Sequence, residues 1–283
     1  MTDVSPEIKF GDTLMLDCTS VGDFQSCHRY ARYRYVDCLS PVEAKMALSF
    51  GHCVHEALFT WYDTGDQAAA LLRWNAICDE NNIPLDGDKR SKTNGAAILL
   101  HYFGQYNVER KREERLAGEV GFCLPVPGIE RVMIAGRMDY LYTVSGNLRI
   151  RDHKTASQIG SNYTYNVNPS LAAAVYTWAA ETVLERRVEM FDFDVVLVAK
   201  EKREAIRFPV MRSQWKIDSA LEDLRMAARD IRSKVASGEW DRNLKHCSSY
   251  GGCQYHAICT TENPAPIIQS MFTIEPWRPY VVE

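Results

Sequence analysis

Hydrophobic residues recur every three or four positions through the first half of the chain, which is the spacing of amphipathic helices. The pattern runs through "KMALSFGHCVHEALFTWY", "AAALLRWNAICDE" and "NGAAILLHYFGQYNVERKREER". We therefore expect a mainly helical region over residues 43–115. From about residue 118 the pattern changes, and "EVGFCLPV", "RVMIAGRMDYLYTV" and "NLRIRDHK" predict three strands.

The second half of the chain alternates helix and strand patterns. A helix is predicted in "PSLAAAVYTWAAETVLERR", because Pro169 stands at its start, where the missing amide proton costs little. Two strands, "MFDFDVVLVAK" and "AIRFPVM", and a long amphipathic helix over about 213–238 follow, and the tail after 240 is irregular. This order predicts the α/β class, with one domain in which helices pack on a mixed sheet.

Composition and charge restrict the function classes only weakly. The 283 residues are 46% hydrophobic and 25% charged, as in ordinary globular proteins. The opening "MTDVSPEIKF" does not resemble a signal peptide, and no run of eighteen apolar residues occurs, so we expect no membrane segment and a cytoplasmic or nucleoid-associated protein. The net charge of −4 gives no global attraction to nucleic acid. Two basic patches, within residues 29–35 and 110–115, are candidates for local binding, but both patterns are also typical of solvated helix faces.

The stretch "GRMDYLYTVSGNLRIRDHKTAS" predicts a hairpin with charged residues on one face. If Ser145 and Gly146 form a two-residue turn, positions whose numbers sum to 291 lie opposite each other, which pairs Asp139 with Asp152. The Cβ atoms of such neighbours lie about 4.5 to 5.5 Å apart, where like charges repel. The side-chain period of two puts Lys154 on the face of Asp152 and leaves only the backbone carbonyl of His153 for that face.

Two carboxylates, a main-chain oxygen and an ammonium together suit Mg²⁺ or Mn²⁺, which prefer oxygen ligands. Such a site polarises a phosphoryl oxygen and acidifies a bound water. A surface ion network in which Lys154 neutralises both aspartates is the alternative. His55, four residues after Gly51 in "GHCVHEALF", is a candidate nitrogen ligand that favours Mn²⁺, and Glu119 is a candidate carboxylate ligand. A packed histidine and an exposed strand end are the competing interpretations.

The nine cysteines are an odd number and do not indicate a disulfide framework. Five of them are scattered, whereas Cys247, Cys253 and Cys259 form a regular C-x5-C-x5-C pattern in the tail.

These motifs together resemble the PD-(D/E)xK nucleases, specifically the RecB-like exonucleases with a CRISPR-associated branch. The hairpin resembles the G-x-x-D strand and the D-x-K-T strand of that family, and "FGHCVHEAL" resembles its upstream metal-binding helix. "SVGDFQSCHRYARYRY" is similar to the family's N-terminal element, and the tail resembles its cysteine triplet. The matches follow the family's order from about residue 20 to 259.

The resemblance implies that His55, Asp139 and Asp152 bind the metal and that Lys154 is catalytic. It also implies a 4Fe-4S cluster, held by Cys27, Cys247, Cys253 and Cys259, although four thiolates also suit a structural zinc ion. The implied fold is a restriction-endonuclease-like mixed sheet flanked by helices in a single domain, 1–283. Its parts are a helical region at 43–115, a nuclease core at 118–238, and a cysteine tail at 240–283 that pairs with Cys27.

Two departures from the family pattern stand in this chain. The first cysteine gap is five residues rather than two, with Tyr250 in the position of an expected cysteine. The family helix after D-x-K carries Q-x-x-x-Y, but here Ala172 replaces the glutamine and only Tyr176 remains as a candidate DNA contact.

The sequence therefore predicts a divalent-metal-dependent deoxyribonuclease, an exonuclease rather than an endonuclease. Its expected substrates are DNA ends or single strands in recombination, repair or replication, and proteins of such complexes are candidate partners. The main alternative is a non-catalytic nucleic-acid-binding or assembly subunit that retains the fold and the cluster. A third alternative is a zinc-stapled protein whose acidic hairpin is only structural.

Overall fold

The computed structural model describes residues 13–43, 46–160, 163 and 169–278 of the chain. The chain divides into two compact units. Unit 1 comprises Met1–Glu43, Phe122–Gly136 and Asp218–Glu283, and unit 2 comprises Ala44–Gly121 and Arg137–Ile217. All of the predicted metal and catalytic residues belong to unit 2, and the four predicted cluster cysteines belong to unit 1.

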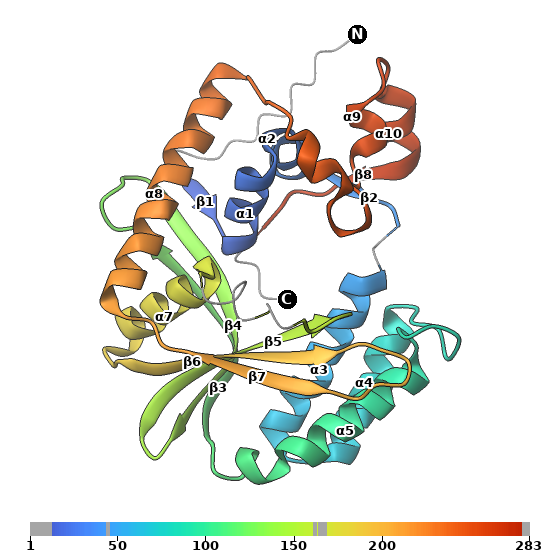
Figure 1. Ribbon diagram of the computed structural model, residues 1–283. Coiled ribbons are helices and arrows are strands. Elements are labelled where there is room, and N and C mark those ends of the chain that lie inside the picture. The colour runs from blue at the N-terminus through green and yellow to red at the C-terminus, as the bar shows by residue number, and fades with distance from the viewer. Residues whose placement is uncertain (1–12, 44–45, 161–162, 164–168, 279–283) are drawn as a thin grey trace. The chain divides into compact units, whose positions relative to one another are not determined.

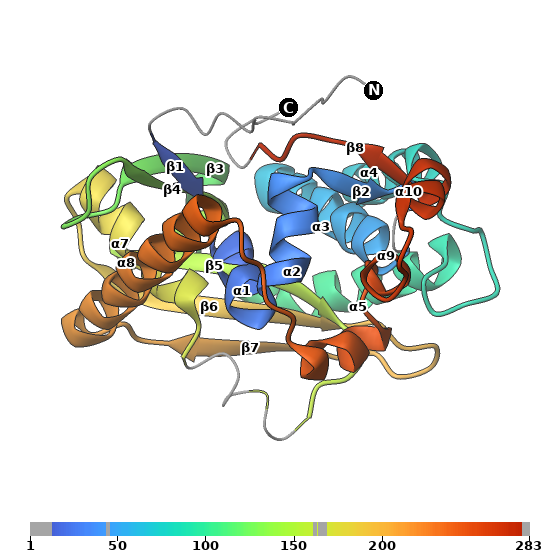
Figure 2. The ribbon, with the colours of Figure 1, turned by 90° about the horizontal axis from the view of Figure 1, so that it is seen from above.

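Unit 2 begins with three helices that pack against one another: α3 (Met46–Thr64), α4 (Gln67–Glu80) and α5 (Lys92–Arg110) (Figure 2). The side chains of Asp66 and Ser91 cap the starts of α4 and α5 by accepting hydrogen bonds from backbone N–H groups of their first turns. The helices share a core that includes fully buried Trp61 and Trp74. This core continues onto the sheet through side chains such as Tyr140 and Val196.

Four strands of unit 2 carry the candidate site: β4 (Val132–Val144), β5 (Asn147–Ala156), β6 (Val188–Leu197) and β7 (Ala205–Val210) (Figure 1). β5 pairs antiparallel with β4 and parallel with β6, and β6 pairs antiparallel with β7. The predicted hairpin register is confirmed, because Val144 faces Asn147 and Tyr140 faces Arg151. Ser145 and Gly146 have φ of 52° and 80°, as the two central residues of a type I′ turn require.

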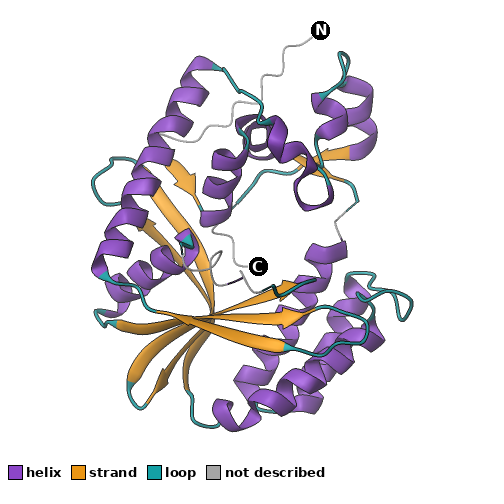
Figure 3. Cartoon of the chain, in the orientation of Figure 1, coloured by secondary structure: helices purple, strands orange, loops and turns teal. Residues whose placement is uncertain are grey.

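Helices lie on both faces of this sheet (Figure 3). Helix α7 (Leu171–Leu184) contacts one face of β6, where Tyr176 lies against Phe191, and α3 to α5 cover the other. Residues 191–198 are accordingly buried without interruption, which is the pattern of a strand covered on both sides. The predicted fold class, a mixed α/β sheet flanked by helices, is confirmed.

Two strands run through both units. β4 is one of them, and β3 (Glu114–Pro125), which pairs with β4, is the other. In unit 1 the short strand β1 (Leu14–Leu16) runs parallel to the start of β4, with Leu14 opposite Val132.

The rest of unit 1 is helical apart from one small sheet. Its helices are α1 (Cys18–Ser26), α2 (His28–Ala31), a π-helical turn (Arg32–Val36), α8 (Gln214–Ser237, which begins in unit 2), a 3-10 turn (Leu244–Gly251), α9 (His256–Cys259) and α10 (Ala265–Met271). The sheet pairs β2 (Leu39–Pro41) with β8 (Phe272–Ile274) in antiparallel fashion.

The elements predicted between residues 43 and 238 correspond to α3, α4, α5, β3 to β7, α7 and α8. One boundary was wrong: the helical region ends at Arg110, and β3 already begins at Glu114 rather than near 118. The tail, expected to be irregular, contains short helices and β8. None of the helices in the described part of the chain is long and apolar enough to cross a bilayer.

Candidate active site

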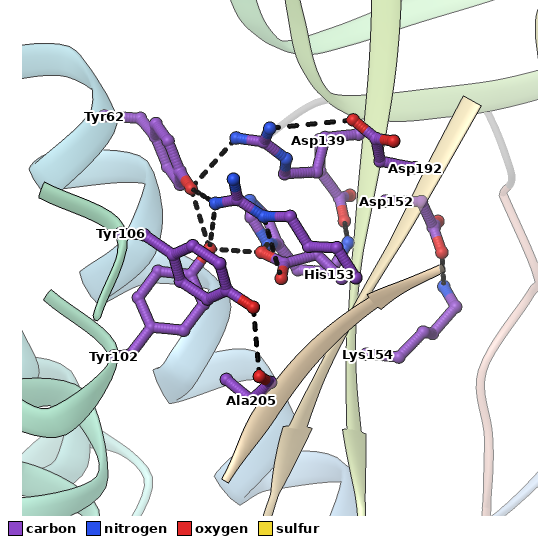
Figure 4. Close-up of polar contacts among 12 residues, drawn as sticks. Tyr62, Tyr102, Tyr106, Asp139, Asp152, His153, Lys154, Asp192 and Ala205 are labelled. Atoms are coloured by element: carbon purple, nitrogen blue, oxygen red, sulfur yellow. Dashed lines mark hydrogen bonds and ion pairs between the residues drawn. The ribbon is translucent and has the colours of Figure 1, made fainter. Parts of the chain in front are cut away.

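Strand β5 presents two chemically different faces. Asp152 and Lys154 point to one side of the strand, and the His153 ring points to the other, toward tyrosines of α3 and α5 (Figure 4). The opposite orientation of adjacent side chains follows from the strand period of two. The predicted placement of Asp152 and Lys154 on a common face is confirmed by their direct contact.

Lys154 and Asp152 form a close ion pair. The Nζ atom of Lys154 lies 2.9 Å from Oδ1 and 2.8 Å from Oδ2 of Asp152. Burial raises the pKa of the Asp152 carboxyl and outweighs the opposing effect of Lys154. For Lys154, burial lowers the pKa, but the charges of Asp152 and Asp139 outweigh it and hold the pKa above its ordinary value. Lys154 therefore stays protonated, with about half of its side chain accessible to solvent.

Asp139 lies at the end of the β4–β5 ladder, one step beyond the last paired residues. Its Oδ2 atom accepts a hydrogen bond of 2.7 Å from the backbone N–H of His153 and lies 3.5 Å from Nδ1 of His55 on α3. Gly51 allows α3 to approach β5, since a Cβ atom there would lie only 3.2 Å from Oγ1 of Thr155. The absence of a side chain thus brings the His55 ring to the hairpin.

Glu119 reaches the same point from the middle of β3. Its φ of 52° is in the left-handed region, which a glutamate rarely adopts. Exposure along β3 alternates regularly before and after this residue, but the phase shifts by one position across Gly118 and Glu119. Such a bulge redirects a side chain, and strained backbone of this kind is frequent at functional sites. Glu119 therefore lies within β3, whereas the alternative interpretation had placed it at an exposed strand end.

His55, Glu119 and Asp139 each offer one ligand atom, and these three atoms all lie within 4.8 Å of one another. Burial lowers the pKa of His55 to about 4 despite the nearby charge of Asp139, so the imidazole is neutral near pH 7. Burial, together with repulsion from Asp139, raises the pKa of Glu119 to about 7 although Nε of Arg137 lies 2.7 Å from its Oε2. A neutral imidazole and closely spaced carboxylates are donors that suit a divalent cation, because each binds a metal in its deprotonated form.

The opposite face of β5 carries a buried network of charges and tyrosines (Figure 4). Arg151, which has no exposed side-chain surface, binds both carboxylate oxygens of Glu113 at 2.7 and 3.1 Å. Nδ1 of His153 lies 2.9 Å from Asp194, which also pairs with Arg207 at 3.3 Å. Burial raises the pKa of Asp194, but the hydrogen bond of His153 and the charge of Arg207 outweigh it and hold the pKa well below the ordinary value.

Several aromatic side chains complete this network. Tyr62 stacks on the His153 ring at a centroid distance of 5.4 Å, and its hydroxyl accepts hydrogen bonds from Arg151 and Arg207. Tyr102 donates a short hydrogen bond to Asp194, and Tyr142 donates one to Asp192. The network supports the strand on which the charged site is built, because a change of register would separate its buried charged partners.

The sequence did not indicate this network. A signal existed in "MFDFDVV", since Asp192 and Asp194 stand two apart in an otherwise apolar strand and must share a face. Tyr163 was also missed: its phenol interacts electrostatically with Lys154 and Asp152, and its ring stacks on Phe208 at 5.0 Å.

Three other predicted site residues lie outside the donor group of His55, Glu119 and Asp139. Asp152 forms the ion pair with Lys154 but does not belong to the set of donor atoms that lie within 4.8 Å of one another. The backbone of His153 lies at the site, where its N–H group holds Asp139 and a further backbone hydrogen bond reaches the His55 ring. Tyr176 is half-buried against Phe191, which is the packing contact that had been the alternative to a DNA contact.

The four predicted cluster cysteines line one small cavity of unit 1, of about 30 Å³. Tyr30, Tyr33 and Tyr255 also line this cavity. The backbone N–H of Asn243 donates a hydrogen bond of 3.5 Å to Sγ of Cys27. Among the described residues, no three of these sulfur atoms lie within 4.8 Å of one another.

Both basic patches expected from the sequence contribute to folding. Arg110 donates to the backbone carbonyls of Trp61 and Tyr62, and Arg115 pairs with Asp63 at 3.0 Å. In the patch within residues 29–35, Tyr30 and Tyr33 pack on Tyr255, with ring centroids 5.0 and 5.5 Å apart, and Arg29 donates to a backbone carbonyl. These contacts favour the structural interpretation of both patches.

Comparison with known proteins agrees with this geometry. The family model of the PD-(D/E)XK nuclease superfamily matches residues 17–260. The crystal structure of a presumed exonuclease from Eubacterium rectale superposes with a TM-score of 0.52 at 13% identity, over 88% of this chain and 92% of that one, which is a likeness of fold. The structure of the protein SSO0001 gives a TM-score of 0.41 at 12% identity, over 87% of this chain and 85% of that one. No curated protein sequence matches the chain. Since the family model covers most of the sequence, including every candidate site residue, the chain belongs to the PD-(D/E)XK nuclease superfamily.

Proposed function

We propose that the protein is a divalent-metal-dependent deoxyribonuclease and that unit 2 contains its active site. The observation that carries the proposal is the convergence of three oxygen and nitrogen donors, from His55, Glu119 and Asp139, beside the Asp152–Lys154 ion pair. A surface ion network would not need a glutamate held in left-handed backbone or a histidine kept neutral by burial. Membership of the superfamily supplies the reaction class, hydrolysis of phosphodiester bonds.

The donor set fits Mn²⁺ and Mg²⁺. Two carboxylates provide the hard oxygen ligands that both ions take, and the single imidazole favours Mn²⁺. We assign His55, Asp139 and Glu119 as direct ligands, with Asp152 and the His153 carbonyl as further ligands. A bound divalent ion would polarise the scissile phosphate and lower the pKa of a water.

The remaining residues have roles that do not depend on that ion. Lys154, protonated and half-exposed, stabilises the negative charge that develops on the phosphate during attack. Asp152 holds the Nζ atom of Lys154 on the metal face of β5, and the His153 N–H holds Asp139 in place. Tyr163, near Lys154, lies where it can contact the substrate backbone.

We further propose the RecB-like type and exonuclease action on DNA ends or single strands, in recombination, repair or replication. The order of the motifs from "SVGDFQSCHRYARYRY" to the tail cysteines supports the subtype. The similar fold of the presumed exonuclease from Eubacterium rectale agrees with it.

The experiment compares the wild type with Asp152→Asn and Lys154→Met on end-labelled single- and double-stranded DNA with Mn²⁺ or Mg²⁺. We expect metal-dependent cleavage that either substitution reduces at least about 100-fold, the effect of removing transition-state stabilisation. Asp86→Asn, at an exposed position outside the site, is the matched control. Absence of cleavage by the wild type, or full activity of Asp152→Asn, would overturn the proposal. Circular single-stranded DNA distinguishes exonuclease from endonuclease action, because an exonuclease needs a free end and leaves circles intact.

We propose that Cys27, Cys247, Cys253 and Cys259 bind a 4Fe-4S cluster in unit 1. Their shared cavity and the N–H donor to Cys27 Sγ suit thiolate ligands. Four cysteine thiolates are the ligand set both of a 4Fe-4S cluster and of a tetrahedral zinc site, and the family resemblance favours the cluster. Anaerobic purification followed by iron, sulfide and zinc analysis decides between them, and a protein with one zinc and no iron would refute the cluster.

A further inference from the structure

Unit 2 contains a cavity whose lining includes none of the residues of the candidate active site. It has a volume of about 650 Å³ and is formed where the β4–β5 turn, the α7–β6 connection and the β7–α8 connection meet. Gly146 and Leu148 line it from the start of β5, whereas Asp152 and Lys154 stand near the end of the same strand. None of the proposed catalytic steps uses this cavity.

The lining of this cavity is strongly basic. It contains four cationic side chains, Arg186, Arg187, Arg212 and Lys216, and a single carboxylate, Glu189. Glu189 is itself paired with an arginine outside the cavity, at 2.8 Å, whereas Arg187 is paired with Glu181 at 3.2 Å and Arg186 donates to the backbone carbonyl of Gly146. In a chain whose net charge is −4, this is a local concentration of positive charge suited to an anionic ligand.

Large apolar side chains stand exposed at the edge of the cavity. Trp215, between the lining residues Ser213 and Lys216, is 73% exposed, and Met211 is 68% exposed. Tryptophan is enriched at binding interfaces relative to the rest of a protein surface. Cations that neutralise phosphates, combined with an aromatic ring on which a base can stack, are the chemistry of single-stranded nucleic-acid binding.

The spacing along β5 relates this cavity to the hydrolytic site. Six residues separate Gly146 from Asp152, which at about 3.3 Å per strand residue is about 20 Å. A single-stranded oligonucleotide of a few residues spans this distance. One nucleic-acid chain could therefore occupy both places.

We propose that the cavity formed by Arg186, Arg187, Arg212 and Lys216 is an anchoring site for single-stranded DNA, with Trp215 as the stacking platform. The identity of the ligand as DNA rests on the proposed function. The site holds the sugar-phosphate chain at a distance from the scissile bond and so makes binding dependent on oligonucleotide length.

Binding and cleavage are measured separately to test this. Fluorescence anisotropy with a labelled thymidine 20-mer, in EDTA to prevent hydrolysis, gives the dissociation constant over a series of salt concentrations. Lys216→Glu should weaken binding at least about fivefold and reduce the slope of log K against log salt by about 0.7 for each phosphate that the variant no longer neutralises. Trp215→Ala should weaken binding by a similar factor with no change in slope, because stacking releases no counterions.

Lys200→Glu, at an exposed lysine of unit 2 outside the cavity and outside both basic patches, is the matched charge reversal, and circular dichroism verifies the fold of each variant. The proposal is overturned if the wild type does not bind the 20-mer, or if Lys216→Glu and Trp215→Ala bind it as well as Lys200→Glu does. Loss of binding in both variants in a protein that cleaves no DNA with any metal would refute the proposed nuclease activity and leave the anchoring site standing.

Discussion

Glu119 connects the candidate metal site to the stability of the protein. Burial and the charge of Asp139 raise the pKa of its carboxyl to about 7, from an ordinary value of 4.5. A carboxylate with a raised pKa is ionised in the folded protein only at a cost in stability, since the unfolded chain ionises it freely. Glu119→Gln removes this cost while preserving the shape of the side chain.

The sign and size of the effect follow from proton linkage. Between pH 4.5 and pH 7 the folded protein binds more protons at Glu119 than the unfolded chain, so the stability falls as the pH rises through this range. At about 1.36 kcal/mol for each pKa unit, the full cost above pH 7 is about 3.4 kcal/mol. At pH 5 the ionisation of Glu119 already costs about 0.8 kcal/mol of stability, so the cost rises by about 2.5 kcal/mol between pH 5 and pH 8.5. The 20% exposure of the side chain makes this an upper bound.

Urea unfolding in EDTA at pH 5 and pH 8.5 measures the difference between the variant and the wild type. Glu119→Gln should gain stability relative to the wild type on going to pH 8.5, by up to the amount above. Saturating Mn²⁺ should offset most of this difference at pH 8.5, because a cation at 100 times its dissociation constant adds about 2.7 kcal/mol to the protein that binds it. Glu201→Gln, an exposed control, should show neither effect. If Glu119→Gln differs from the wild type by the same amount at both pH values, the electrostatic account of this site is incorrect.

Three further substitutions test the site and its support. His55→Ala should weaken Mn²⁺ binding at least about tenfold in calorimetric titration, because it removes the only imidazole of the donor group. Asp194→Asn should lower the unfolding free energy by about 1.5 to 3 kcal/mol in urea titration, since it removes the buried charge that Arg207 and His153 share and leaves Arg207 with Glu109 and Glu113. Gly95→Ala should lower it by about 1 to 3 kcal/mol and reduce the melting temperature, because the new Cβ would lie 2.1 Å from a ring carbon of Trp74.

The parts of the site that the sequence predicted are those set by local geometry. The turn at Ser145 and Gly146 determines the register of β4 and β5, and the strand period then places Asp152 and Lys154 on one face. Both rules act over a few residues, so the pattern of the sequence contains them. The helices α3 to α5 were predictable for the same reason, since their periodicity reflects the core that they share.

The parts that escaped prediction depend on contacts between distant segments. Glu119 was a candidate ligand from the sequence, but the phase shift of β3 that accompanies its place in the donor group was not predicted, although Gly118 stands at the shift. The partners of Arg151 come from α3, β4, β6 and the α5–β3 connection, and their meeting depends on the tertiary packing. In unit 1, the β2–β8 pairing joins residues more than two hundred positions apart, and neither three-residue strand is long enough to show a period.

The buried network gives a physical reason for the precision of the hydrolytic face. A slip of β5 by one residue would bring Asp152 and Lys154 to the inner face and would turn Arg151 outward, leaving the fully buried Glu113 without its counter-charge. Removing one partner of a buried ion pair costs about 3 to 5 kcal/mol, a large fraction of the stability of a typical domain. A partly exposed pair such as Lys154 with Asp152 contributes too little to fix a register by itself. The buried ion pairs behind β5 therefore hold this strand in the register that places Asp152 and Lys154 on the opposite face. The geometry of the candidate site thus depends on residues that are not part of it.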